Sequence, residues 1–255
     1  MTGMDLTIVG CSGSLAGPDS PASCYLVRAH DGQREWQILL DLGSGALGAL
    51  QRHTDPLDLD AVLLSHLHPD HCLDLTGLRV LRAHGPRPAS DPLDVWAPDG
   101  ADERMARAYG VLRPQPMGGM TFRRLEDMVP LRVGPFTVTP FAVVHPVPTF
   151  GLRVEAGGRV LAYSGDTDSC PGLSPLLADA DVALVEASYL EGRDEGRGVH
   201  LTARRAAEAA VDAGARRLVL THLPPWTDAA DARSEAAQVW PGAVEVARPG
   251  RTLRV

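Results

Sequence analysis

The sequence predicts an α/β fold, and two observations support that prediction. Short apolar runs that look like buried strands recur along the chain, and helical patterns lie between them. Most of the runs end in Gly, Ser, Asp or His, and the loops beyond strand ends are where α/β sheets place their chemistry. The runs cover residues 6–9, 38–40, 61–64, 160–163, 182–185 and 218–220.

The first half of the chain is expected to add two helices to these strands. Cys72, Leu75, Leu78 and Leu81 recur at every third residue and form an apolar stripe, so Cys72 is interpreted as a core residue rather than a metal ligand. Residues 82–116 are rich in Pro and Gly, which predicts loops around one helix near residues 101–109.

The second half is expected to contain a hairpin and a further helix. Residues 134–167 alternate as strands do, with Gly157 and Gly158 as the hairpin turn. A helix is predicted from Thr202, as its N-cap, to Gly214, where a glycine typically ends a helix.

One internal echo joins the two halves. Each half contains a buried strand that runs into Ser or Thr, His, Leu and a later Pro, in "VLLSHLHP" (62–69) and "LVLTHLPP" (218–225). Two equivalent halves would each deliver a histidine to one seam. The echo is short, so chance similarity is the alternative.

Composition excludes several classes of protein. The chain has 24 Lys and Arg against 32 Asp and Glu, without blocks of either sign, which disfavours an extended nucleic-acid groove. The four cysteines form no C-x-x-C pair, which fits a reducing cytoplasm. The beginning of the chain lacks a basic segment followed by an apolar one, and no apolar run approaches the roughly 20 residues that cross a bilayer. We therefore expect a cytoplasmic protein that does not enter a membrane.

A cluster of histidines predicts a metal site. Three of the nine histidines, His66, His68 and His71, fall within six residues beside Asp70 and after a buried strand. Residues i and i+2 of an extended segment face the same way, so His66 and His68 are expected to point together before Pro69 stops the strand. The next two side chains would surround a second position. Imidazole with carboxylate suits zinc, or manganese or iron in a more open site; the alternative is a histidine-rich surface loop.

A site of two metals needs ligands from distant segments as well. The candidates are His145, Asp166 and His222, each of which follows a predicted strand. For each of them, a residue satisfied locally in the core or at the surface is the alternative interpretation.

The combined pattern resembles the metallo-β-lactamase superfamily. It consists of H-x-H-x-D-H, a later His, an Asp in S-G-D-T and a C-terminal His after a strand, and the resemblance runs from Leu6 to Trp226. The resemblance implies a four-layer αββα sandwich in a single domain over residues 1–255, with a binuclear metal centre at the seam. It implies that one ion is held by His66, His68 and His145, the other by Asp70, His71 and His222, and that Asp166 bridges them.

Within the superfamily the chain looks most like the branch of the RNase Z endonucleases and the bacterial cyclic-nucleotide phosphodiesterases. "VEAS" (185–188) and "HLT" (200–202) are similar to the Glu and His motifs of that branch. The resemblance implies that Glu186 orients His200, which acts as general acid, and the expected catalytic residues are Asp70, Glu186 and His200. A structural ion pair for Glu186 and a loop position for His200 are the alternatives.

The substrate is expected to be small. RNase Z enzymes carry a long basic arm, in many members between the ligands that match His145 and Asp166, whereas only residues 146–165 lie there in this chain. Residues 10–23, 41–53 and 223–227 also look like the cyclic-nucleotide enzymes. We therefore expect hydrolysis of 3′,5′-cyclic nucleotides such as cyclic AMP to 5′-monophosphates.

Other functions remain open at this point. An RNase Z-type tRNA 3′-processing endoribonuclease is the main alternative, and a domain that binds a metal or a nucleotide without catalysis is another. Lactam or thioester hydrolysis also stays possible, since fold does not fix substrate. The resemblance implies a homodimer. Trp226 is expected either to stack on a base or to pack within its loop.

Overall fold

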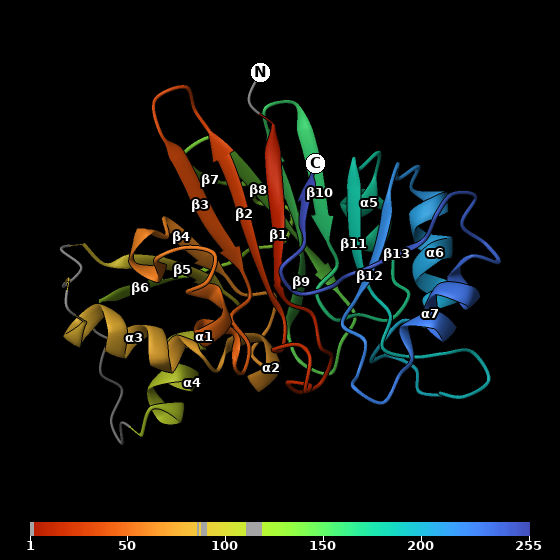
Figure 1. Ribbon diagram of the computed structural model, residues 1–255, viewed down its shortest axis with the longest axis horizontal. Coiled ribbons are helices and arrows are strands. Elements are labelled where there is room, and N and C mark those ends of the chain that lie inside the picture. The colour runs from red at the N-terminus through yellow and green to blue at the C-terminus, as the bar shows by residue number, and fades with distance from the viewer. Residues whose placement is uncertain (1–2, 86, 88–90, 111–118) are drawn as a thin grey trace.

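Two β-sheets face each other at the centre of the molecule, and helices cover their outer sides (Figure 1). This computed structural model describes residues 3–85, 87, 91–110 and 119–255. The arrangement confirms the predicted α/β class and the four-layer αββα sandwich. Among the described residues, no helix combines the length and the apolar character needed to cross a bilayer.

The first sheet is antiparallel on one side and parallel on the other. Its strands pair antiparallel from β14 to β3 and parallel from β3 to β6. In spatial order they are β14 (Thr252–Arg254), β1 (Met4–Gly10), β2 (Cys24–His30), β3 (Glu35–Leu40), β4 (Ala61–Leu63), β5 (Leu93–Ala97) and β6 (Met120–Arg124).

The second sheet repeats this plan. Its strands pair antiparallel from β7 to β10 and parallel from β10 to β13. The carboxyl ends of the parallel strands meet at one edge of each sheet, where α/β proteins collect their functional loops. In spatial order the strands are β7 (Leu131–Val133), β8 (Phe136–Val143), β9 (Thr149–Ala156), β10 (Arg159–Tyr163), β11 (Val182–Glu186), β12 (Leu218–Thr221) and β13 (Glu245–Val246).

Three apolar clusters hold the layers together. The largest fills the space between the sheets, and two others lie between each sheet and its helices. The first sheet is covered by α1 (Ala46–Leu50), α3 (Leu75–His84) and α4 (Ala101–Ala108), and the second by α5 (Leu173–Leu177), α6 (Ala203–Asp212) and α7 (Ala229–Ala236). Two short elements, η1 (Pro56–Asp58) and α2 (Pro69–Cys72), lie in the connections of the first half.

Most of the predicted elements are confirmed. All six apolar runs overlap strands, namely β1, β3, β4, β10, β11 and β12. Gly157 and Gly158 have φ of 57° and 75°, and they form the turn between β9 and β10. The Thr202 hydroxyl caps α6 by accepting from the Arg205 N–H, and α4 lies where a helix was predicted.

Two expectations need correction. The strand before the histidine cluster ends at Leu63 rather than at Pro69, because the Ser65 N–H donates to the Asp41 carboxylate instead of to a neighbouring strand. Residues 82–116 contain β5 as well as a helix; its side chains alternate between buried and half-buried, a pattern hidden by the Pro-rich surroundings. Of that stretch, residues 86, 88–90 and 111–116 lie outside the described residues.

The apolar stripe of the first half is divided between two helices. Cys72 ends α2, and Leu75 begins α3. Cys72, Leu75 and Leu78 are buried in the cluster between the first sheet and its helices. Core packing of Cys72 is therefore confirmed.

Candidate metal centre

The predicted ligands come together from loops that follow four strands. His66 and His68 lie between β4 and α2, and α2 begins with the turn that presents Asp70 and His71. The remaining three ligands, His145, Asp166 and His222, follow β8, β10 and β12. Chain segments far apart in sequence thus supply one site at the edge where the two sheets meet.

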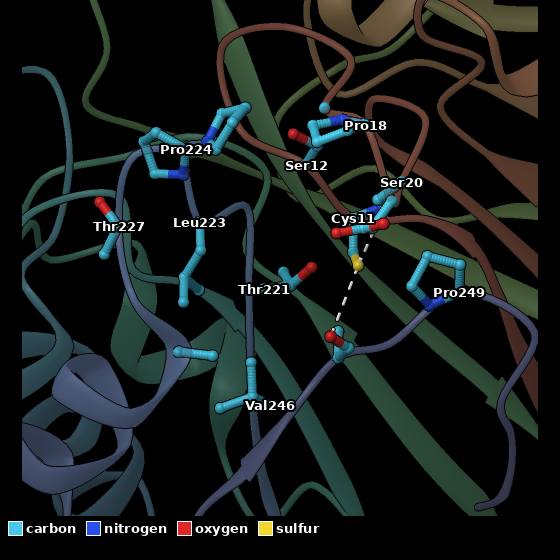
Figure 2. Close-up of a pocket in the computed structure, with 15 residues that line it drawn as sticks. Cys11, Ser12, Pro18, Ser20, Thr221, Leu223, Pro224, Thr227, Val246 and Pro249 are labelled. Atoms are coloured by element: carbon cyan, nitrogen blue, oxygen red, sulfur yellow. Dashed lines mark hydrogen bonds between the residues drawn. The ribbon is translucent and has the colours of Figure 1, made fainter.

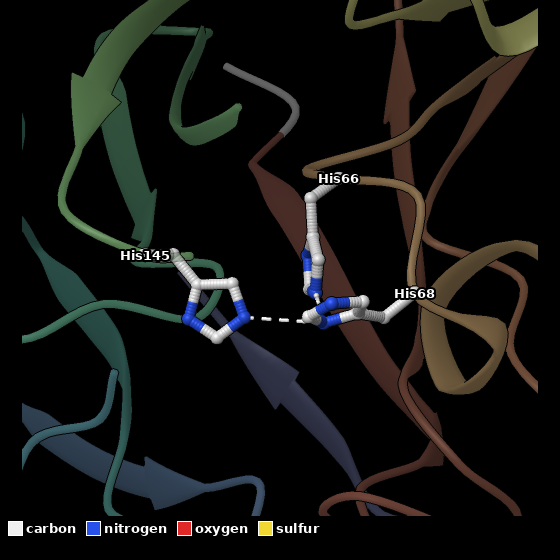
Figure 3. Close-up of side chains that lie close together, drawn as sticks. All are labelled: His66, His68 and His145. Atoms are coloured by element: carbon white, nitrogen blue, oxygen red, sulfur yellow. Dashed lines mark hydrogen bonds between the residues drawn. The ribbon is translucent and has the colours of Figure 1, made fainter. Parts of the chain in front are cut away.

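Three histidines form the first group of donors. Nδ1 of His68 lies 3.1 Å from Nε2 of His66 and 3.1 Å from Nε2 of His145. Figure 3 shows the three rings converging from different segments of the chain. The prediction that His66 and His68 face the same way is borne out by this geometry, although the backbone between them is irregular.

The second group combines imidazole with carboxylate. Nε2 of His71 lies 3.1 Å from Nε2 of His222, which is 3.2 Å from Oδ2 of Asp70. Nε2 of His71 also lies 3.3 Å from Oδ1 of Asp166. All four side chains are buried, which makes the group a closed cluster of nitrogen and oxygen donors.

Asp166 lies between the two groups. Its Oδ2 is 3.7 Å from Nε2 of His66 in the first group and 3.4 Å from Nε2 of His222 in the second. Its Oδ1 is buried without a hydrogen-bond partner. A buried carboxylate oxygen left without a donor is costly unless a positive charge approaches it.

Outer hydrogen bonds fix which ring nitrogens face inward. Nδ1 of His71 donates to Oδ2 of Asp41 at 2.8 Å, and Nδ1 of His145 donates to the carbonyl of Val199 at 2.8 Å. Each ring therefore turns its Nε2 toward the centre. This is how proteins orient imidazole ligands around a metal.

Neighbouring serines do the same for two more rings. The Ser65 hydroxyl donates to Asp41, so it accepts from Nδ1 of His66 at 3.0 Å. The Ser188 hydroxyl donates to the carbonyl of His222, so it accepts from Nδ1 of His222 at 2.8 Å. The Nε2 lone pairs of both rings are left to face the site.

Asp41 is the main residue that the sequence analysis missed. Its buried carboxylate accepts from Ser65 N at 2.7 Å, from Nδ1 of His71 at 2.8 Å and from the Tyr163 hydroxyl at 2.7 Å. The signal was present, because Asp41 follows a buried apolar run just as Asp166 does. Asp41 binds the candidate ligand His71 directly and reaches a second, His66, through Ser65. It thereby orients the centre.

The electrostatics of the centre suit cations. Burial holds the pKa of His66 well below its usual value and lowers the pKa of His145, so these rings are neutral. Burial disfavours the charged form of His71, but the carboxylates of Asp166 and Asp41 outweigh it and raise the pKa of His71 well above its usual value. Among the described residues, the ion-pair contacts of Asp70 and Asp166 are all with histidines. The donor set and the unpartnered oxygen therefore fit divalent metal ions.

His200 and Glu186 form a pair beside this cluster. Nδ1 of His200 lies 2.8 Å from Oε1 of the buried Glu186, which also accepts from Thr167 N at 2.9 Å. The His200 ring lies 5.3 Å from the ring of His145 and 5.6 Å from that of His222, centre to centre. Burial lowers the pKa of His200, but the Glu186 carboxylate more than offsets it and raises the pKa to about 9.

A cavity lies next to the segment that carries His222. It has a volume of about 210 Å³ and is lined mainly by apolar atoms (Figure 2). Thr221 and Leu223, the two neighbours of His222, face Ser12 and Pro18 across it. The loop that contains Ser12 also donates the Ser14 N–H to Nε2 of His222 at 3.3 Å.

Comparison with known proteins finds the same architecture. Residues 37–223 match the family model described as the beta-lactamase superfamily domain. Protein ML1173 of Mycobacterium leprae (strain TN) is 43% identical, over 98% of this chain and 88% of that protein. The probable metallo-hydrolase YhfI of Bacillus subtilis (strain 168) is 29% identical over 97% of this chain and 98% of its own length. The YhfI crystal structure superposes on this chain with a TM-score of 0.88, 28% identity and complete coverage of both chains.

Ribonuclease Z of Myxococcus xanthus (strain DK1622) is a further relative. It is 29% identical over 100% of this chain and 99% of that enzyme. The alignment spans 312 positions, more than the 255 residues of this chain, so the ribonuclease contains additional segments. The alignment with YhfI spans 249 positions, so it requires no long additional segment in YhfI.

Proposed function

This chain belongs to the β-lactamase superfamily, and on that premise we propose that it is a binuclear metal-dependent phosphodiesterase acting on small phosphodiesters. The proposed substrates are 3′,5′-cyclic nucleotides, cyclic AMP among them, with 5′-monophosphates as products. One observation supports this above all others. Seven candidate ligands form two groups that meet at Asp166, with the Glu186 and His200 pair against them.

The proposed ligands divide as the two groups do. The three histidines of the first group would hold one divalent ion, and Asp70, His71 and His222 the other, with Asp166 shared. When bound, such ions polarise a phosphoryl oxygen and lower the pKa of water toward neutrality. We propose zinc, with manganese or iron as alternatives, because the donors are imidazole nitrogens and carboxylate oxygens.

The departing ribose oxygen needs a proton, and His200 is placed to supply it. Because Glu186 engages Nδ1, the proton that moves is the one on Nε2. His200 starts the step as an imidazolium, donates this proton to the leaving 3′ oxygen and ends as a neutral imidazole. A positioned proton donor contributes typically about 10² to 10⁴ in rate.

The surroundings of the centre favour a small substrate. The connection between His145 and Asp166 is the hairpin β9–β10, with no room for an arm that would hold a folded RNA. The net charge of −8 also opposes binding to a long polyanion. The adjacent apolar cavity offers space for the uncharged part of a nucleotide.

An RNase Z-type endoribonuclease is the second candidate. It is supported by 29% identity with the Myxococcus enzyme over the full length of this chain. The extra segments of that enzyme argue against transfer of its tRNA substrate to this chain, because contact with many phosphates is what gives affinity for a large RNA.

One experiment tests both candidates. Protein loaded with zinc or manganese is assayed for metal content and for hydrolysis of cyclic AMP, bis(p-nitrophenyl) phosphate and a precursor tRNA. We expect close to two ions per chain and turnover of cyclic AMP above that of the tRNA. Metal-loaded protein that leaves every cyclic nucleotide intact would refute the proposal, and faster tRNA cleavage would favour the second candidate.

A matched pair of variants links activity to the proposed ligands. His68→Ala should lose both bound metal and cyclic AMP hydrolysis. His84→Ala removes an exposed histidine at the end of α3 and should keep both.

A further inference from the structure

We propose that Asp168 is the positioning residue that places His200 against the metal centre. The inference rests on the proposed function, because it concerns the proton donor of that reaction. Asp168 was not among the candidate residues, although it lies two positions after Asp166. Its side chain points away from the ligands and toward the loop that carries His200.

The Asp168 carboxylate binds the chain directly before His200. Oδ2 accepts from the Gly198 N–H at 2.7 Å and from Nε of Arg197 at 3.0 Å. Oδ1 pairs with the guanidinium of Arg205 in α6. The Asp168 residue is 3% exposed and Arg205 is largely buried, whereas the side chain of Arg197 lies mostly in solvent. A carboxylate buried this deeply is stable only when its oxygens are fully paired, and here two guanidiniums and the backbone amides of Gly198 and Ser169 pair them.

The backbone of Asp168 holds the other side of the site. Its N–H donates to the carbonyl of Val144 at 2.9 Å, next to His145. His145 in turn donates from Nδ1 to the carbonyl of Val199. One residue therefore joins the segment of a proposed ligand to the segment of the proposed proton donor.

The loop before His200 depends on such outside contacts. Residues 187–202 contain only turns and one isolated bridge, so no helix or sheet ladder of their own fixes His200. The side-chain bond to Glu186 orients the ring, and Tyr189 N holds the carbonyl of Leu201 on the C-terminal side of His200 at 3.0 Å. The contacts of Asp168 with Arg197 and Gly198 add the restraint on the N-terminal side of His200, and an error of about 1 Å in such a group costs roughly 10² in rate.

The choice of leaving group tests this role. Asp168→Asn keeps the shape of the side chain but removes the charge that pairs with Arg197 and Arg205. We expect kcat for cyclic AMP to fall by about 10². Hydrolysis of bis(p-nitrophenyl) phosphate should fall only about threefold, because nitrophenolate leaves as a stable anion without a donated proton.

Asp181→Asn is the matched control. Like Asp168, Asp181 pairs with two arginines, Arg159 at 2.9 Å and Arg216 at 2.7 Å, and it accepts from one backbone amide, Val160 N at 2.9 Å. It lies at the opposite end of β10 and β11 from the ligands. Asp181→Asn should therefore leave the hydrolysis rates of cyclic AMP and bis(p-nitrophenyl) phosphate unchanged or lower both by the same factor.

Amide hydrogen exchange gives a readout that needs no activity. Asp168→Asn should speed exchange in residues 191–201, and Asp181→Asn should not. An equal loss on both esters, a loss of bound metal or unchanged exchange in that segment would overturn the inference. If the wild-type protein hydrolyses neither ester, the proposed function fails, and the exchange result alone then decides whether Asp168 positions the His200 segment.

Discussion

Asp41 and Asp166 occupy similar places in the two sheets but have different surroundings. Both follow the first strand of a parallel half, β3 in the first sheet and β10 in the second. Asp41 receives hydrogen bonds on both carboxylate oxygens, whereas Oδ1 of Asp166 receives none. An aspartate at the same position in the fold therefore orients candidate ligands in the first half, whereas in the second half it is itself a candidate ligand.

The sequence echo between the halves does not follow this equivalence. The echo pairs the end of β4 with the end of β12, but by order and pairing β4 corresponds to β11. The hydroxyls also differ: Ser65 supports His66, whereas Thr221 bonds to the Tyr25 hydroxyl and Ser188 supports His222. His222 has φ of 58°, a conformation that L residues rarely adopt. The two halves thus share one plan and each delivers a histidine to the site, but the two echoing segments do not occupy equivalent positions in the sheets.

The largest effect is expected at the unpartnered carboxylate. Asp166→Ala removes the oxygen atoms that lie between both ligand groups, so at least one ion should be lost and cyclic AMP turnover should fall by about 10³ or more. Metal analysis and kcat measure the two changes. Retention of two ions per chain with near-normal turnover would show that Asp166 is not shared.

Asp41→Asn should have a smaller effect of a different kind. The amide places a donor where three donors now converge, so the free energy of unfolding should drop by roughly 1 to 3 kcal/mol. Metal affinity should weaken about 10- to 100-fold because His71 loses its acceptor. Thermal unfolding and metal titration measure these quantities, and Asp181→Asn controls for loss of a half-buried, hydrogen-bonded carboxylate elsewhere. Unchanged metal affinity would show that Asp41 does not orient the ligands of the centre.

The ligand cluster was predictable from sequence because much of it is local. His66, His68, Asp70 and His71 lie within one short connection, and the position after a buried strand sufficed to predict that they converge. The distant candidates His145, Asp166 and His222 were predicted by the same rule and by resemblance, and the structure brings them to the same site. Asp41 obeys the rule too, but its role depends on which donors the fold brings to it, and sequence spacing does not contain that information.

The contacts of the His200 loop were beyond sequence analysis for the same reason. Asp168 is bound by Arg197 and Arg205, which are separated from it by an irregular segment and by β11. Helices and strands have a periodicity that reveals their buried face, but an irregular loop has none. The fold was therefore easier to predict than the support of the proton donor.

Glu186→Gln should move the pH dependence of turnover. His200 acts as an acid in its protonated form, so activity falls as pH rises through its pKa, which Glu186 raises to about 9 against the effect of burial. Without the carboxylate, burial remains and the alkaline limb should shift to lower pH. The kcat profile for cyclic AMP from about pH 6 to about pH 10 measures the shift. An alkaline limb at unchanged pH would show that Glu186 does not set the pKa of the proton donor.

The smallest effect on turnover is expected at Trp226, in the loop that follows His222. This loop differs most from the loop that follows His66. After His66 the chain enters α2 and adds two more candidate ligands, whereas after His222 two prolines lead into a turn closed by Thr227 N and the Pro224 carbonyl. Trp226 in that turn is 65% exposed, so it does not pack within its loop. Such an indole is free to stack on a base.

Trp226→Ala should therefore raise KM for cyclic AMP about fivefold, with kcat nearly unchanged, because stacking on one base contributes roughly 1 kcal/mol or more. Trp226→Phe keeps an aromatic face and should restore most of the affinity. Bis(p-nitrophenyl) phosphate has no base, so a similar rise in its KM would indicate that the loop itself has moved. Equal KM values in all three proteins would mean that the loop after His222 does not read the base.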